Sequence, residues 1–170
     1  MNLYIAMGTY EYLKTLKDTY PHEDFLFLQN ENTCLLLHET ESDSLFKSPK
    51  KYEVIDGAGT LSVHEGYAVL HYIPVTDEGR PIFEYRFNTL SAQLVKVPGF
   101  DTARVLRPLS SDTYIILTVW KNAADFKKWQ SGELFNKAFS NNQTKVKSDK
   151  KLPQIFPRSS YMTRYSVEKE

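Results

Sequence analysis

The residues from Asp112 to Phe139 constrain the fold more than any other part of the chain. Tyr114 to Trp120 is a run of β-branched and aromatic residues with one leucine, which is too short for a solitary helix and typical of a buried strand. Asn122 follows this run and can cap a helix, with Asp125 three positions later to complete a capping box. The sequence therefore predicts a strand that leads directly into a helix.

The helix after this strand is expected to carry aromatic residues on one face. Phe126 and Trp129 are three positions apart, so they lie on the same side of the helix. Ser131 and Gly132 interrupt the helix, and Ser131 can cap a second short one. The apolar residues of that second helix are Leu134, Phe135, Ala138 and Phe139. The combined aromatic face either fills a core or lines a pocket for a flat ligand.

The remainder of the chain shows the same succession of elements twice. A segment rich in glycine and small or polar residues, 57–66, is the predicted linker between the two parts. The first part predicts strand, helix, strand, strand and helix, at residues 3–7, 10–20, 25–28, 33–39 and 52–55. The second predicts a strand at 67–75, a helix opened by residues 76–78 with apolar positions from Ile82 to Leu94, strands at 100–106 and 114–120, and the broken helix. Residues 161–167 alternate and predict an added strand.

Two successive βαββα units predict an α+β fold of two ferredoxin-like halves in one chain. Each unit has an antiparallel sheet with helices on one face, and the bare face of one sheet can cover the bare face of the other. The expected division is 1–60 for a degenerate first half, 66–142 for the second half, and 143–170 for a loop and the last strand. The chain would then be a monomer that imitates the dimeric α+β barrel.

Composition excludes several classes of protein. The net formal charge is zero, which argues against a nucleic-acid binder, and no segment approaches the length of a membrane span. Cys34 is the single cysteine, so no disulfide can form within the chain and a reducing, cytoplasmic location is expected. Residues 1–65 hold 5 basic and 11 acidic side chains, a balance of −6, and residues 66–170 hold 16 and 10, a balance of +6. This asymmetry can steer an anionic ligand to the second half or hold the two halves together.

Short segments of the second half carry a family resemblance. They are Thr118–Lys121, Phe126–Trp129, Arg104–Pro108 and Pro98–Phe100. Residues 66–141 resemble the antibiotic biosynthesis monooxygenase (ABM) domain and, within that superfamily, the Isd-type heme-degrading monooxygenases. The whole chain is similar to the longer single-chain (HmoB-like) members and to the staphylococcal signal transduction protein TRAP, also at residues 38–40 and 52–56. The resemblance implies a heme-binding protein with the dimeric-barrel fold.

The resemblance also implies three site residues. These are an asparagine on the first strand of the domain, a tryptophan on its last helix, and a histidine one segment later that ligates heme iron. In this sequence the three positions hold His71, Trp129 and Phe139. Phenylalanine cannot ligate iron, but a neutral imidazole can. Because strand residues alternate between faces, either His71 or Tyr72 faces the pocket, and His71 could bind iron from the opposite side.

Two functions from different classes follow from the resemblance. The first is an oxidoreductase that cleaves heme oxidatively and releases iron, with O2 and an external reductant delivered by an electron donor. Trp129 and His71 would be catalytic, His71 would also be the metal ligand, and both would contact heme together with Phe126, Phe135 and Phe139. The second is a non-catalytic signalling, heme-sensing or carrier protein on the same scaffold.

A structural role is the alternative for each of these residues. Trp129 and the three phenylalanines can simply pack in a core, and His71 can be hydrogen-bonded in a strand without a ligand. Three other histidines have no metal-ligating partner at a useful spacing and are interpreted as non-catalytic: His22, His38 and His64. The lysine-rich run 145–151 is interpreted as a solvated loop, with a guide for heme propionates as the alternative.

Overall fold

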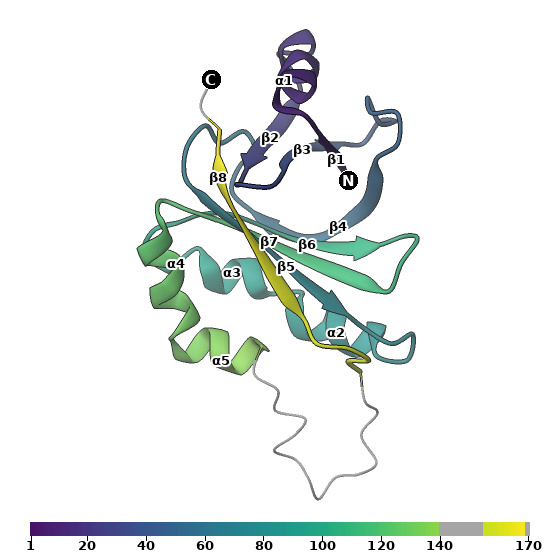
Figure 1. The fold of residues 1–170 in the computed structure, drawn as a ribbon. Coiled ribbons are helices and arrows are strands. Elements are labelled where there is room, and N and C mark those ends of the chain that lie inside the picture. Colours follow the sequence, from purple (N-terminus) through teal and green to yellow (C-terminus); the bar gives the residue numbers. More distant parts are fainter. Residues whose placement is uncertain (140–154, 169–170) are drawn as a thin grey trace, which may run out of the picture.

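A computed structural model describes residues 1–139 and 155–168. Within these residues, eight strands form one closed barrel in the order β1-β3-β2-β8-β5-β7-β6-β4, and all neighbours are antiparallel (Figure 1). The strands are β1 (Asn2–Gly8), β2 (Asp24–Gln29), β3 (Cys34–Thr40), β4 (Lys50–Ala58), β5 (Tyr67–Pro74), β6 (Phe100–Pro108), β7 (Thr113–Trp120) and β8 (Tyr161–Val167). The helices are α1 (Tyr10–Thr19), α2 (Arg80–Phe87), α3 (Leu90–Leu94), α4 (Ala123–Gln130) and α5 (Glu133–Phe139).

The barrel is built from two sheets with the same strand order. The first half gives β4-β1-β3-β2 and the second gives β8-β5-β7-β6, so each sheet places its last strand beside its first. Each last strand also pairs with the second strand of the other half, β4 with β6 and β8 with β2. The predicted α+β fold of two ferredoxin-like halves in one chain is therefore confirmed.

One element of the first half was predicted wrongly. Residues 52–55 belong to strand β4, not to a helix, so the first half has the order strand, helix, strand, strand, strand. A register shift between Val54 and Asp56 marks a bulge, which breaks the alternation and makes a strand resemble a helical pattern. Gly57 lies inside this strand, and Gly59, with a φ of +80°, turns the chain after it. The linker consequently begins at residue 59 and not at 57.

The other predicted elements are present, with shifts at their ends. Thr9 caps α1 by accepting a hydrogen bond from the Tyr12 amide at 3.2 Å. The helix expected to open at residues 76–78 begins instead at Arg80, and its apolar period is divided between α2 and α3. Ile82 is 40% exposed, so it does not belong to the inner face of α2.

Three apolar clusters divide the interior. One fills the barrel, with members such as Leu28, Leu70 and Leu117. A second lies between the sheet of the second half and helices α2 to α5, and a third lies between the first half and α1. Figure 1 shows α1 on one side of the barrel and α2 to α5 on the other. No helix in the described part of the chain combines the length and apolarity that crossing a bilayer requires.

An ion pair joins the two halves across the barrel. The Arg104 guanidinium on β6 donates two hydrogen bonds to the Glu39 carboxylate on β3, at 2.6 and 3.0 Å. The two side chains are only 8% and 11% exposed. Further guanidinium N–H groups donate to the carbonyls of Ala58, Gly59 and Ala103, so this charge is compensated inside the protein.

Candidate functional site

Strand β5 directs His71 toward the helices. Val69 and Ile73 belong to the apolar cluster under α2 to α5, whereas Ala68, Leu70 and Tyr72 face the barrel interior. Because side chains alternate along a strand, His71 lies on the same face as Val69 and Ile73. Of the two residues that the sequence left open, His71 faces the helical side and Tyr72 does not.

The His71 imidazole is buried among aromatic rings. It is 7% exposed, and its centroid lies 4.9 Å from that of Phe139 and 6.4 Å from that of Phe135. Its Nε2 atom is 3.1 Å from Ser160 Oγ. Burial disfavours the charged ring and lowers the pKa of His71 to about 4, so the imidazole is neutral at pH 7. A neutral imidazole retains one nitrogen lone pair that can bind a metal.

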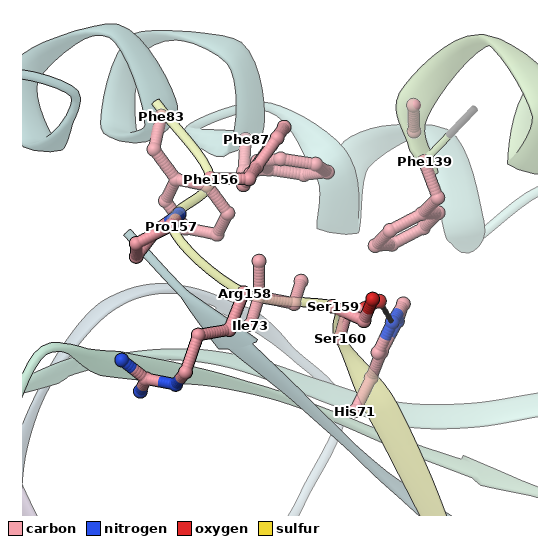
Figure 2. A pocket seen from close by; sticks show the side chains of 11 residues that line it. His71, Ile73, Phe83, Phe87, Phe139, Phe156, Pro157, Arg158, Ser159 and Ser160 are labelled. Carbon is pink, nitrogen blue, oxygen red and sulfur yellow. Dashed lines mark hydrogen bonds between the residues drawn. The ribbon is translucent and has the colours of Figure 1, made fainter. Parts of the chain in front are cut away.

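A cavity of about 420 Å³ opens beside His71 (Figure 2). This volume is in the range of small-molecule sites. Strand β5, helices α2 and α5, and the segment before β8 supply the wall. The lining residues are His71, Ile73, Phe83, Phe87, Ala138, Phe139, Phe156, Pro157, Arg158, Ser159 and Ser160. The site therefore combines apolar aromatic walls with one neutral nitrogen donor and one guanidinium.

The Trp129 helix fills a core and does not open a slot. Asn122 caps α4 as predicted, by accepting a hydrogen bond from the Asp125 amide at 2.9 Å. Trp129 is 6% exposed and its ring packs 5.2 Å from Trp120 and 4.9 Å from Phe135. The gap that Trp129 and Phe126 share with the sheet measures only about 10 Å³. Of the two alternatives for the aromatic face, core packing holds at Trp129, and pocket lining holds at Phe139.

Several lining residues were missed from the sequence. Phe83 and Phe87 fit the helical period of α2, but nothing local shows that this helix packs opposite His71. Ser160 and Arg158 precede β8 in a stretch that resembles a polar loop, and they reach the cavity only because β8 pairs with β5. The lysine run 145–151 lies outside the described residues. In the described part of the chain, no three or more His, Cys, Asp or Glu side chains cluster as metal ligands.

Comparison with known proteins finds a family match in the second half. Residues 66–141 match the family model described as antibiotic biosynthesis monooxygenase. The match covers the second half of the chain, the part in which the sequence shows the ABM resemblance. The matched span includes β5 and the helices that line the cavity, but it ends before β8, the strand that carries the chain from Ser160 back beside β5.

Two curated relatives bear different functional names. The chain is 27% identical over 169 residues to a protein of Staphylococcus epidermidis named signal transduction protein TRAP, covering 97% of this chain and 96% of that protein. It is also 27% identical over 132 residues to a heme-degrading monooxygenase of Listeria monocytogenes, covering 78% of each chain. The two names correspond to the two functional classes that the sequence left open.

A solved structure agrees with the fold. The structure of a major regulator of staphylococcal pathogenesis superposes with a TM-score of 0.80 at 23% identity, covering 99% of this chain and 98% of that one. The likeness includes the first half of the chain, which the ABM match does not cover. A solved structure therefore shares the two-part barrel fold over nearly the full length of both chains.

Proposed function

We propose that this protein binds heme in the cavity beside His71 and degrades it as an oxidoreductase of the monooxygenase type. The observation that carries the proposal is a neutral, buried imidazole in an aromatic cavity of an ABM domain. The named activity of the Listeria monocytogenes relative supports the same chemistry. The residues that line the cavity fit heme, because heme needs an apolar slot and an axial nitrogen ligand, and His71 supplies that nitrogen.

His71 would ligate the iron and the phenylalanines would hold the ring. Ligation through Nε2 would replace the hydrogen bond to Ser160. The imidazole would not have to be deprotonated first at pH 7, because it is already neutral. Phe139 and Phe87, 5.1 Å apart, offer faces for stacking. Trp129 would act as a positioning residue, since it packs against Phe135 and Phe139 from behind. Bound heme would supply the redox iron at which O2 reacts with electrons from an external reductant.

A non-catalytic heme-sensing, carrier or signalling protein is the second candidate. Two observations favour it. Phe139 occupies the position at which the family resemblance implies a histidine, so the cavity offers one imidazole and not the family's arrangement. The TRAP relative also matches over nearly the whole chain, whereas the heme-degrading relative matches over 78% of it. In this case heme would be held without turnover, or would not be bound.

Hemin titration followed by reduction separates these functions. The Soret band is recorded as hemin is added to the purified protein, and then with ascorbate under air. Loss of the band with release of iron supports the degrading enzyme. A stable band supports the sensor or carrier, and the absence of any bound spectrum overturns heme binding altogether.

A pair of variants tests the role of His71 in that titration. His71→Ala should abolish the spectrum of ligated heme, whereas His22→Ala should not, because His22 is exposed. An unchanged spectrum in His71→Ala would remove His71 from the site. Phe139 and Phe87 would then need to hold the ring without an axial bond.

The setting proposed for this activity is a monomer in the cytoplasm. Cys34 is free and buried, which agrees with a reducing compartment. One chain already closes the barrel that a dimeric ABM protein would need two chains to form. Size-exclusion chromatography with light scattering should therefore give a mass near 19.7 kDa.

A further inference from the structure

We propose that Arg158 holds a carboxylate of the ligand, so that the cavity selects an apolar ring system bearing an acid over its neutral counterpart. This inference deepens the proposed function and rests on it. Arg158 lines the cavity, and Figure 2 shows its guanidinium at the opposite end from His71 and Phe139. Among the described residues that line the cavity, it is the only one with a positive charge at pH 7.

The guanidinium is available to a second carboxylate. Its Nη1 and Nη2 atoms donate to the two oxygens of Asp112 at 3.0 and 2.9 Å. A guanidinium carries five N–H donors, so three are left when Asp112 has taken two. The Arg158 side chain is 59% exposed and that of Asp112 39%, and an exposed pair of this kind is weak. Asp112 therefore fixes the position of the guanidinium without saturating it.

The rest of the cavity gives a carboxylate no comparable partner. Phe83, Phe87 and Ile73 give the cavity apolar surfaces, and the uncharged Ser159 and Ser160 lie between Arg158 and His71 (Figure 2). His71 is neutral, and Ser160 Oγ is already hydrogen-bonded to it. A carboxylate buried there would lose its hydration and gain no charged partner. An amphiphilic ligand therefore has one favourable orientation, with its apolar body toward His71 and its acid at Arg158.

Metal-free protoporphyrin IX and its dimethyl ester are the matched probes for this inference. The two share one ring system and differ in charge, and neither has an iron for His71 to bind. Dissociation constants are measured by porphyrin fluorescence for the wild type, Arg158→Gln, Arg158→Lys, and Arg86→Gln as the control. Arg86 is an exposed arginine of α2 outside the cavity lining, so Arg86→Gln changes the net charge by the same amount as Arg158→Gln without changing the cavity.

The wild type should bind the diacid about fivefold more tightly than the ester, the upper end for an ion pair with an exposed guanidinium. Arg158→Gln should reduce this preference to about twofold or less, Arg158→Lys should keep part of it, and Arg86→Gln should keep it all. Asp112→Asn should strengthen diacid binding and leave ester binding unchanged, because it removes a negative charge that repels the ligand carboxylate beside the guanidinium.

Two results would overturn the inference. Equal affinity of the wild type for diacid and ester would do so, and so would an Arg158→Gln variant that weakens both equally. Failure of the proposed function is distinct, because it appears in the hemin titration as a missing His71-dependent spectrum even when the diacid is preferred over the ester. If neither porphyrin binds, this inference falls, while the hemin titration still decides the proposed function.

Discussion

The buried neutral imidazole of His71 makes the stability of this protein depend on pH in a defined way. Burial lowers the pKa of His71 from its ordinary 6.5 to about 4. The unfolded chain takes up a proton near pH 6.5, and the folded chain does not until about pH 4, so stability is complete above pH 6.5 and falls as the pH decreases toward 4. At 1.36 kcal/mol per pKa unit, His71 contributes about 3 kcal/mol, of which about 2 kcal/mol is lost between pH 7 and pH 5.

The variant His71→Asn isolates this contribution. Urea unfolding is followed by the fluorescence of Trp120 and Trp129 at several pH values between 7 and 5. The free energy of unfolding of the wild type minus that of the variant should fall by about 2 kcal/mol from pH 7 to pH 5, whatever its value at pH 7. Other titrating groups are shared by both proteins and largely cancel. His22→Asn, at an exposed position, should show no such trend.

A difference between wild type and His71→Asn that stays constant from pH 7 to pH 5 would refute this reasoning. It would mean that folded His71 takes up its proton as readily as the unfolded chain does. The cavity would then be wetter than its aromatic lining indicates, and His71 would be a charged group at mildly acidic pH. An axial bond to iron would have to compete with that proton.

Three further substitutions have expected outcomes of their own. Trp129→Ala should lower the free energy of unfolding by about 3–5 kcal/mol in urea titration, because it empties a filled core position. Glu39→Ala should also cost about 3–5 kcal/mol by the same measurement, since it leaves the Arg104 charge buried, and the double change Glu39→Leu with Arg104→Met should cost less than the single one. Phe139→His adds an imidazole beside His71, so hemin affinity and the Soret position should both change in a spectroscopic titration.

Each of the three has a result that would count against it. A loss below 1 kcal/mol for Trp129→Ala would indicate that the α4 aromatic face is not a packed core. A double variant less stable than Glu39→Ala would show that the Arg104–Glu39 pair stabilises the barrel beyond its desolvation cost. Hemin binding identical to wild type in Phe139→His would place the porphyrin away from residue 139.

Most elements of the fold could be predicted from local sequence patterns, and the one element that was predicted wrongly, strand β4, contains a local irregularity. The strand 114–120, the Asn122 cap and the Thr9 cap each depend on residues close in sequence, so the predictions hold. Strand β4 was mistaken for a helix because the bulge at Ile55 disrupts its alternation. Its identity is set by pairing with β1 and β6, and those partners are distant in the chain.

The site was less accessible to sequence reasoning than the fold. His71 could be singled out from the family resemblance, but which face it takes depends on how β5 packs. The sequence left Trp129 open between a packed core and a pocket wall, and in the structure its ring packs against Trp120, Phe135 and Phe139. The open volume lies beyond Phe139, where α2 and the segment before β8 meet, and no local pattern brings those two elements together.

The unequal helix content of the two halves has a consequence for ligand stoichiometry. Two identical chains related by a twofold axis would carry two identical sites. Here α1 is the only described helix on the first sheet, and nothing in residues 41–49 of the described chain repeats α4 or α5. A titration of this protein should accordingly saturate at one porphyrin per barrel. Only the second half would then carry a ligand site, although both halves share the same strand order.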